Sequence, residues 1–414
     1  MKRQIFKYLA VAAIAVSAAL VTSCDDDDKD NKDAAVTFYT LITTANPLTD
    51  GIVTRSPNKE KYTAEDKVTI MAIAYDGFIF DGWENGDTQA SIEITMDANK
   101  TYTAKFKSDE EKCEDSEEGD DEMQMSMIAV KSEVTIWLKG TGDATVYWGN
   151  ETSETHTINL FTVTKYSHDY STSSPRTITI SGKNITYLEC VNNQLTALDV
   201  SKNTALTRLD CVHNLLTALD VSKNTALTEL HCNSNQLTGL DVSKNTALTY
   251  LYCHNNQLTA LDVSGTTALI GLYCFYNRLA ALDVSGTTAL TVLDCDGNRL
   301  TVLDVSKNPA LMLLNFSSNQ LTALDVSKNP ELKYLIFSNN QLTALDVSEN
   351  TVLTELWCIS NQFTTDALND LFGTLHNNSG SKTIWIKDNL GTATCTKSMA
   401  IEKGWTVNDY SIYY

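Results

Sequence analysis

The sequence predicts a mostly β protein whose C-terminal half is a solenoid of stacked parallel β coils. Two small β domains are expected before the solenoid, and a small α/β cap is expected after it. Three observations lead to this fold class. A 21-residue unit recurs nine times, the apolar positions of its first half alternate as in a short strand, and residues 36–182 hold short β-rich runs separated by turn residues.

The composition excludes several classes of protein. The 414 residues carry 31 basic and 52 acidic side chains, a formal net charge of −21, and 43% of them are hydrophobic. Such a chain can bury the cores of several globular domains, but it lacks the basic surface that nucleic acid or anionic lipid requires. The acidic residues gather in residues 25–33, in residues 108–124 and at one repeated position, which indicates solvation rather than a substrate site.

Residues 1–23 have the pattern of a signal peptide. A basic start, Met1–Lys7, precedes twelve apolar residues, Leu9–Leu20, and this run is too short to span a bilayer as a helix. Val21–Cys24 then resembles the lipobox of bacterial lipoproteins. That resemblance implies cleavage before Cys24, acylation of its thiol and amine, and membrane contact through this lipid only. An ordinary secretory signal with an incidental cysteine is the alternative.

The acidic residues 24–35 are expected to form a tether. Residues 25–30 resemble the export tag of surface-exposed lipoproteins in some Gram-negative bacteria. The resemblance implies a location in the cell envelope, anchored in the outer membrane and exposed at the surface. A plain solvated tether is the other interpretation.

Residues 36–107 are expected to form the first β domain, with strands at 36–39, 67–74, 91–96 and 101–106. The strings Gly77–Trp83, Ile94–Asp97 and Asn99–Phe106 resemble the divergent B-repeat of internalins, which implies a spacer or adhesive module. Trp83 is expected in the core rather than in a carbohydrate platform. The acidic residues 108–124, which include Cys113, have too few apolar side chains to fold and are expected to be a linker.

Residues 125–182 are expected to form a second β module. Strands are predicted near 134–138, 144–148 and 176–180. Val146–Asn150 and His168–Tyr170 resemble elements of PKD-like domains, although the expected aspartate after Gly149 is absent. Because no linker follows, this module is expected to cap the N-terminal end of the repeats.

Residues 183–362 contain the repeats, which are defined by two columns and one tetrad. The first column holds Cys190, Cys211, Cys232, Cys253, Cys274, Cys295, Phe316, Phe337 and Cys358. The second, three residues on, holds Asn193, Asn214, Asn235, Asn256, Asn277, Asn298, Asn319, Asn340 and Asn361. The tetrad Leu-Asp-Val-Ser recurs unaltered eight times. This pattern resembles leucine-rich repeats, and its cysteine is similar to the cysteine ladder of the internalin J-like type.

The columns have physical reasons. In a short strand Leu230 and Cys232 would point into the coil while Glu229 and His231 point out, and the apolar columns can be buried only if successive coils stack. A buried asparagine amide can bond both N–H and C=O groups where the strand turns, so its column is expected to be a structural ladder. The cysteines are expected to pack as small hydrophobes and to bind no metal. A Cys358–Cys395 pair remains open.

The aspartate of the tetrad is expected to face outward on every coil. Lysines, serines or backbone N–H groups could offset the repulsion between these carboxylates, and a calcium ladder is the alternative, although a GGxGxD pattern is missing. Residues 363–414 are expected to form the C-terminal cap. Helices are predicted from Thr365 to Leu375 and at 398–403, and strands at 383–386 and 405–407.

The outward positions of the first half-repeat vary, and core packing does not dictate them. The candidate binding residues on this face are Tyr250, Tyr252, His254, Tyr273, Phe275, Tyr276 and Trp357. Grouped aromatic side chains are typical of binding hot spots. We therefore expect a non-catalytic adhesion protein that binds an extracellular protein, with no cofactor and no nucleic acid. Glycan binding and a spacer without a specific ligand are the alternatives; hydrolase, P-loop and dinucleotide-binding motifs are absent.

Overall fold

The computed structural model describes residues 37–46, 51–56, 59, 61–74, 78–108 and 124–410. The signal peptide, Cys24, the acidic tether and most of the acidic linker lie outside the described residues. The described chain divides into two compact units, one within residues 1–73 and 80–106 and one within 74–79 and 107–414. Each unit is considered by itself.

The first unit is built from short strands with alternating buried and exposed residues. The strands are β1 (Phe38–Tyr39), β2 (Leu41–Asn46), β3 (Gly51–Ser56), β4 (Tyr62–Thr63), β5 (Lys67–Ala74), β6 (Phe78–Trp83), β7 (Ser91–Thr95) and β8 (Lys100–Ser108). They form two three-stranded sheets, β2-β8-β6 and β3-β5-β7, and the pair β1-β4. Trp83 is 2% exposed and donates a hydrogen bond from Nε1 to the Gln89 carbonyl (2.9 Å), so it is a core residue, as the sequence indicated.

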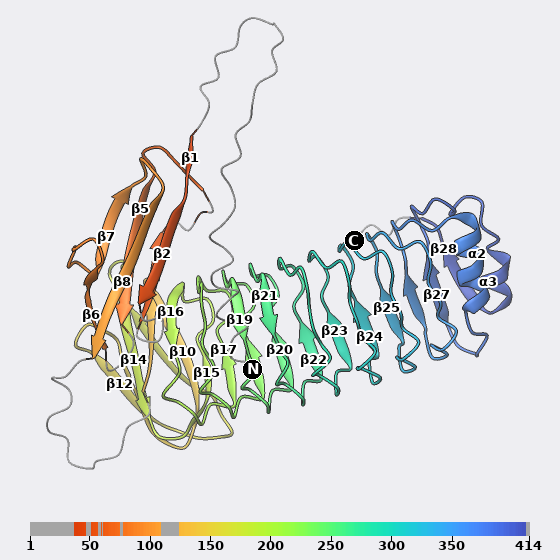
Figure 1. Cartoon of the computed structure of the whole chain (residues 1–414). Coiled ribbons are helices and arrows are strands. Elements are labelled where there is room, and N and C mark those ends of the chain that lie inside the picture. The colour runs from red at the N-terminus through yellow and green to blue at the C-terminus, as the bar shows by residue number, and fades with distance from the viewer. Residues whose placement is uncertain are drawn as a thin grey trace, which may run out of the picture. The chain divides into compact units, whose positions relative to one another are not determined.

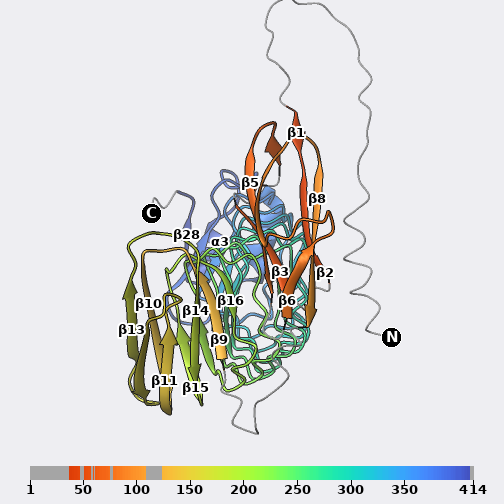
Figure 2. The same ribbon diagram turned by 90° about the vertical axis from the view of Figure 1, so that its left-hand side faces the viewer.

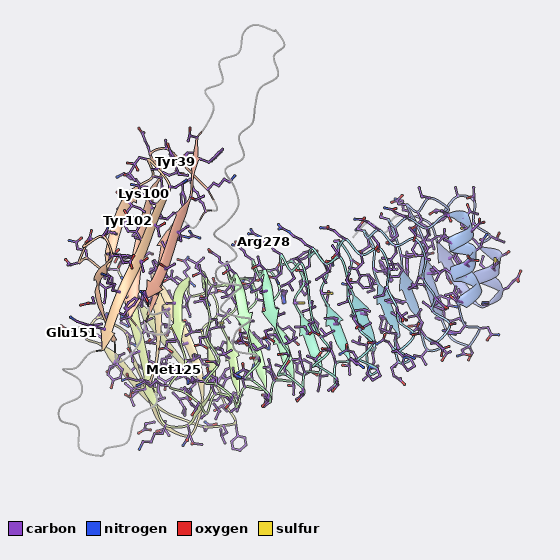
Figure 3. All side chains as sticks on the ribbon, viewed as in Figure 1. Tyr39, Lys100, Tyr102, Met125, Glu151 and Arg278 are labelled. Carbon is purple, nitrogen blue, oxygen red and sulfur yellow. The ribbon has the colours of Figure 1, made fainter. Side chains whose placement is uncertain are left out.

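The second unit begins with a β sandwich that covers the first coil of the repeats (Figure 2). Its strands are β9 (Gln124–Ala129), β10 (Glu133–Gly140), β11 (Gly142–Tyr147), β12 (Ser153–Ile158), β13 (Thr164–Asp169) and β14 (Arg176–Gly182). Both of its sheets continue into the repeats, because β15 (Ile185–Glu189) pairs with β10 and β16 (Leu195–Asp199) pairs with β9. Met125 of β9, labelled in Figure 3, is buried at this junction, 3.3 Å from Asn203 Nδ2.

The repeats form a parallel sheet in which each 21-residue coil adds one short strand (Figure 1). The strands after β15 are β17 (Arg208–Asp210), β18 (Glu229–His231), β20 (Tyr250–Tyr252), β22 (Gly271–Tyr273), β23 (Val292–Asp294), β24 (Leu313–Asn315), β25 (Tyr334–Ile336) and β26 (Glu355–Trp357). The register is exact from coil to coil, so Leu209, Leu230 and Leu251 stack inside while their neighbours point outward. On the second half-repeat, apart from β16, which pairs with β9, only β19 (Gly239–Asp241) and β21 (Ala260–Asp262) pair as strands within the described coils.

The asparagine column forms the predicted ladder. Asn256 Oδ1 accepts a hydrogen bond from the Leu237 N–H (2.9 Å), and Asn256 Nδ2 donates to the Cys232 and Cys253 carbonyls (both 3.0 Å). A second ladder, which the sequence analysis did not assign, follows the Leu-Asp-Val-Ser tetrad. There Asn245 Nδ2 donates to the carbonyls of Val221 and Asn224 on the preceding coil (both 2.9 Å). Each coil is thus tied to its neighbour at two corners.

The cysteine column is buried, and all of its thiols are free. Burial raises the pKa of the Cys232 thiol to about 12, so the column stays protonated and uncharged at neutral pH. Phe316 and Phe337 fill the same column and stack on each other, with ring centroids 5.6 Å apart. Cys358 and Cys395 do not form a disulfide. The column therefore packs as a hydrophobic ladder, as predicted.

The C-terminal tail continues the solenoid instead of only covering it. Its elements are α2 (Thr365–Thr374), β27 (Lys382–Trp385), α3 (Ser398–Glu402) and β28 (Trp405–Asn408). The strands β27 and β28 extend the parallel sheet beyond β26, and Asn389 takes the ladder position, with Nδ2 donating to the Cys358 carbonyl (2.8 Å). The tail thus adds two coils, and in each of them a helix precedes the strand: α2 before β27 and α3 before β28. Among the described helices, none has the length and apolar character needed to cross a bilayer.

Candidate binding face

We define the variable face as the outward residues of the parallel sheet: the first and third residue of each strand and the residue after the cysteine column. Tyr250, Tyr252 and His254 illustrate these three positions on one coil. The strands hold these side chains at fixed register, because the stacked leucines and asparagines beneath them set the position of every coil. The face is thus a rigid surface on which the sequence is free to vary.

Six of the predicted residues come together on two adjacent coils and form one aromatic cluster. The Tyr252 and Tyr273 rings stack with centroids 4.6 Å apart and planes 4° from parallel. His254 stacks on Phe275 at 4.1 Å, and Tyr276 meets Phe275 edge-on at 5.5 Å. Tyr250 lies 6.4 Å from Tyr252. Tyr276 is 56% exposed and the other rings are half-buried, so the cluster is ordered by its own contacts yet reaches solvent.

Two glycines make room for this cluster. A Cβ atom on Gly271 would lie 2.8 Å from the Tyr250 ring and 3.2 Å from the Tyr273 ring. A Cβ atom on Gly297 would lie 2.4 Å from the Tyr276 ring. Tyr250 and Tyr276 therefore each lean over a position on the following coil that has no side chain. In the sequence, this need for glycine is visible only when residues 21 positions apart are compared, as Tyr250 with Gly271 and Tyr276 with Gly297.

The seventh predicted residue, Trp357, belongs to a separate patch near the C-terminal end of the sheet. Its ring stacks on Trp385 of β27 with centroids 4.2 Å apart, and its Nε1 donates to Glu355 Oε2 (3.1 Å). Four strand steps separate Trp357 from Tyr273. The sequence analysis missed Trp385 because the spacing of the tail departs from 21 residues, although both strands share one register.

Charged residues flank the aromatic cluster on its N-terminal side. Arg208 pairs with Glu229 (2.7 Å), and His231 lies 3.7 Å from Asp210. Burial raises the pKa of Asp210, and the nearby His231 works against this shift. Burial lowers the pKa of His231, and Asp210 works against that shift. Burial also lowers the pKa of His254 to about 4, so this ring is neutral at physiological pH.

Two acidic residues flank the cluster on its C-terminal side. Asp294 ends β23 and Asp296 follows two residues later on the same face. Burial raises the pKa of Asp294 to about 6, with a further contribution from the Asp296 charge. Burial raises the pKa of Asp296 as well, and the neighbouring hydroxyls of Ser318 and Tyr276 oppose that shift. Neither carboxylate forms an ion pair with any described residue.

Half of the unsatisfied buried polar atoms lie on the variable face. Of the buried side-chain nitrogen and oxygen atoms in the described residues that have no hydrogen-bond partner, half are Oδ1 atoms of the second asparagine ladder. The remainder are Arg208 Nε, His231 Nε2, His254 Nδ1, Asp296 Oδ1, Ser338 Oγ and Trp385 Nε1. All of these lie on the variable face. A buried polar group without a partner costs about 1–3 kcal/mol, and such groups in a native structure call for a physical explanation.

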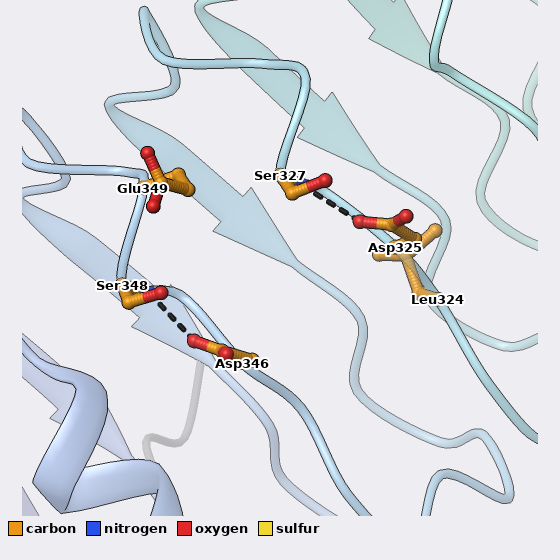
Figure 4. Close-up of a pocket in the computed structure, with 6 residues that line it drawn as sticks. All are labelled: Leu324, Asp325, Ser327, Asp346, Ser348 and Glu349. Carbon is orange, nitrogen blue, oxygen red and sulfur yellow. Dashed lines mark hydrogen bonds between the residues drawn. The ribbon is translucent and has the colours of Figure 1, made fainter.

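The aspartate column on the opposite side of the coils is satisfied internally. Asp325 Oδ1 and Asp346 Oδ1 each accept a hydrogen bond from the N–H of the serine two residues on (both 2.8 Å). These two coils border a shallow pocket of about 230 Å³, lined by Leu324, Asp325, Ser327, Asp346, Ser348 and Glu349 (Figure 4). Within the described residues no group of three or more histidine, cysteine or acidic side chains is arranged to hold a metal ion.

The stacked coils and these ladders have the pattern of leucine-rich repeats with a cysteine ladder. Residues 41–110 match the family described as the divergent InlB B-repeat domain, and residues 225–265 match the family described as leucine-rich repeats in two copies. These two matches agree with the resemblances noted in the sequence. None of the curated proteins matches the chain.

Several solved structures are similar to parts of the chain. The functional domain of InlJ from Listeria monocytogenes, described as including a cysteine ladder, is 35% identical, with a TM-score of 0.43 and coverage of 56% of this chain and 55% of that one. A leucine-rich-repeat protein from Leptospira interrogans is 23% identical, with a TM-score of 0.45 and coverage of 50% and 56%. The chain thus spans about half the length of each.

Proposed function

We propose that this protein is a non-catalytic adhesion protein that recognises an extracellular protein through its variable face. The observation that carries the proposal is the gathering, on this one face, of stacked aromatic rings and of unpartnered buried polar atoms. The few residues that dominate binding at protein interfaces are enriched in aromatic side chains, and a partner would supply the missing hydrogen bonds. The rest of the surface of the coils lacks this combination in the part of the chain that the structure describes.

The ring geometry favours a protein over a glycan. Sugar rings stack on the open faces of aromatic side chains, but Tyr252 and Tyr273 each cover one face of the other at 4.6 Å, and His254 and Phe275 do so at 4.1 Å. The cluster therefore offers mainly ring edges and hydroxyls, together with the outer faces of the two stacks, which suit the varied side chains of a protein. The Trp357–Trp385 stack at 4.2 Å has the same character.

The direct test is an interaction screen with the purified full chain as bait against arrays of extracellular proteins and of glycans. We expect specific protein binding that weakens by a factor of about 100 or more when Tyr252 and Tyr273 are both changed to Ala, the loss typical of a hot spot. The matched control is Asp241→Ala with Asp262→Ala on the second half-repeat, which should leave affinity unchanged. Glycan binding that survives the tyrosine changes, or no binding to either array, would reject the proposal.

We further propose that Cys24 carries the lipid anchor and that the protein stands on the outer surface of the cell envelope. The support is the lipobox-like Val21–Cys24 followed by an acidic segment. Metabolic labelling with a radioactive fatty acid should mark the wild-type protein and should fail to mark Cys24→Ala. Equal labelling of both proteins, or release of the wild type into the medium without detergent, would exclude the anchor.

A further inference from the structure

We propose that the variable face holds an arginine side chain of the partner protein between the aromatic cluster and the carboxylates of Asp294 and Asp296. This inference rests on the proposed function, because it names the chemistry by which the same face would select its partner. It extends the set of binding residues beyond those indicated by the sequence.

The position of the two carboxylates is set by register. Tyr273 of β22 lies directly beside Asp294 on one side, and Asn315 of β24 lies beside it on the other. Adjacent strands of a sheet are about 4.8 Å apart, so the Asp294 carboxylate and the Tyr273 ring border the same space above the sheet. The Tyr276 ring leans over Gly297, directly after Asp296. The acidic pair therefore has an aromatic wall on one side and an uncharged polar wall on the other.

The charges of this site call for a cation. Asp294 and Asp296 are half-buried, no described residue forms an ion pair with either, and Asp296 Oδ1 is buried without a hydrogen-bond partner. A carboxylate removed from water is unfavourable unless a cation or several donors approach it. Here only neutral donors do: the Asp296 N–H at 3.3 Å and Asn315 on Asp294, and Ser318, Tyr276 and the Gly297 N–H on Asp296. The raised pKa of both carboxyl groups reflects the same lack of a positive charge near their buried carboxylates. A cation from a binding partner would remove it.

The same face already holds one guanidinium between an aromatic ring and a carboxylate. The Arg208 guanidinium lies 5.6 Å from the centroid of the Tyr187 ring on one neighbouring coil and 2.7 Å from Glu229 Oε2 on the other. An aromatic ring and a carboxylate thus enclose a guanidinium across three successive strands. Tyr273 and Asp294 place a ring and a carboxylate on directly adjacent strands, without a strand between them, so a guanidinium there would have to enter from above the sheet, and no guanidinium of a described residue pairs with that carboxylate.

A guanidinium fits the site better than an ammonium group does. The guanidinium is planar, can lie against an aromatic ring and can donate two parallel hydrogen bonds to one carboxylate. Lysine offers a compact, strongly hydrated charge without that flat surface. Arginine is accordingly the residue that satisfies both the aromatic wall and the acidic pair.

The experiment is a selection of random peptides on the immobilised full chain at pH 7.5, followed by affinity measurements on the selected peptides by fluorescence anisotropy. We expect enrichment of arginine in the bound peptides. Replacement of that arginine by citrulline, a neutral residue of the same shape, should weaken binding about tenfold or more, because a charge-assisted hydrogen bond is lost. Lysine in its place should bind more weakly than arginine.

Acid should weaken binding of the arginine peptide, since protonation of Asp294 removes the anion. With a pKa of about 6, this carboxylate is mostly ionised at pH 7.5 and mostly protonated at pH 5.0, so affinity should fall about tenfold. The titratable groups facing it are Tyr273 on β22 and Asp296 on its own coil; Asn315 on β24 is neutral. Neither Tyr273, whose pKa is raised, nor His254, with a pKa of about 4, changes charge between these pH values.

Asp294→Asn should reduce this pH dependence, leaving only the contribution of Asp296, whose pKa burial also raises. It should also reduce the preference for arginine over citrulline. Asp304→Asn, on the other side of the same coil, should do neither. Circular dichroism would verify that the variants are folded. If selected peptides lack basic residues yet need Tyr252 and Tyr273, this inference is wrong while the proposed function stands. If arginine is enriched but Asp294→Asn leaves affinity and pH dependence unchanged, the inference is also wrong. If no peptide binds the variable face, both are contradicted.

Discussion

At the scale of single residues, each buried ladder asparagine replaces several missing backbone partners. Asn256 accepts from the Leu237 N–H and donates to the Cys232 and Cys253 carbonyls, which lie where the strands end and ladder bonding stops. An aliphatic side chain could fill the volume but could not supply these bonds. The amide therefore belongs to the architecture and not to the binding chemistry.

We predict that Asn256→Ala lowers the free energy of unfolding by about 2–5 kcal/mol, because it leaves one buried N–H and two buried carbonyls without these partners. Thermal and urea unfolding followed by circular dichroism would measure the loss. The neighbouring variant Gln257→Ala, whose side chain is half-buried and outside the ladder, serves as the control. Similar destabilisation in both variants would contradict a ladder role for Asn256.

Asp294 shows at the same scale that a binding residue can reduce stability. Its pKa rises from 3.8 in the unfolded chain to about 6 in the folded one, so between these values the folded state binds more protons. Its contribution to stability is present below pH 3.8 and is lost as the pH rises through 6. Asp294→Asn should therefore raise the free energy of unfolding by about 2 kcal/mol at pH 7.5 and by little at pH 3.5.

The measurement is the unfolding midpoint of both proteins at these two pH values. Asp304→Asn is the control, because hydrogen bonds from Ser306 lower the pKa of Asp304 and its replacement should not stabilise the protein at pH 7.5. A lower midpoint for Asp294→Asn at pH 7.5 would show that burial does not disfavour its charge.

At the scale of one coil, the second ladder explains why two coils differ from the others at two adjacent positions. Two coils have Gly-Thr where most others have Lys-Asn, at Gly265-Thr266 and Gly286-Thr287. The shorter Thr266 bonds within its own coil, with Oγ1 donating to the Val263 carbonyl (2.7 Å), whereas the Asn245 side chain reaches the preceding coil. At these two coils the backbone comes close to the preceding one: a Cβ on Gly265 would lie 1.8 Å from the Ser243 carbonyl oxygen. The shorter threonine therefore occurs on coils whose backbone lies closer to the preceding coil, and only glycine at the adjacent position leaves room for that closer contact.

We predict that Gly265→Ala destabilises the solenoid by about 1–3 kcal/mol or more, since the added methyl group has no space beside a rigid backbone. Gly239→Ala is the matched control, because a Cβ there meets no atom within 4 Å. Differential scanning calorimetry of the two variants would compare them. Equal transition temperatures would contradict the prediction, because they would mean that the two coils can move apart to accept the methyl group without loss of stability.

At the scale of the whole repeat unit, the N-terminal β sandwich and the first coil share strands. β15 and β16 complete the sandwich sheets, and Leu195, Leu198 and Val200 are buried beneath them. A repeat array without a cap exposes its terminal apolar face to water. The sandwich therefore belongs to the folding unit of the repeats.

We predict that a chain starting at residue 183 associates or aggregates, whereas a chain starting at residue 124 remains monomeric. Size-exclusion chromatography with light scattering would show this difference, and binding of a hydrophobic dye would report the exposed face. If both chains are monomeric and unfold at the same temperature, the sandwich does not act as a cap.

The strongest sequence predictions concerned positions that repeat. The inward leucines and cysteines and the role of Asn256 followed from one local rule applied nine times. The missed strands β2 and β3 belong to a domain without a repeat, and β2 pairs with β8, 59 residues away. Trp385 was missed because the tail abandons the 21-residue spacing while keeping the register. Contacts of this kind depend on packing that no local pattern encodes.

The sequence by itself determined the coil and which of its side chains face inward, because strand alternation and the need to bury apolar columns leave one arrangement. The tertiary structure alone decided which outward residues become neighbours. Tyr273 and Asp294 are 21 positions apart and share one space only because their strands pair in register. Likewise, the depth at which Asp294 is buried, and hence its raised pKa, depends on side chains of other coils. Stacking converts a linear repeat into columns, and the chemistry of the variable face lies in those columns.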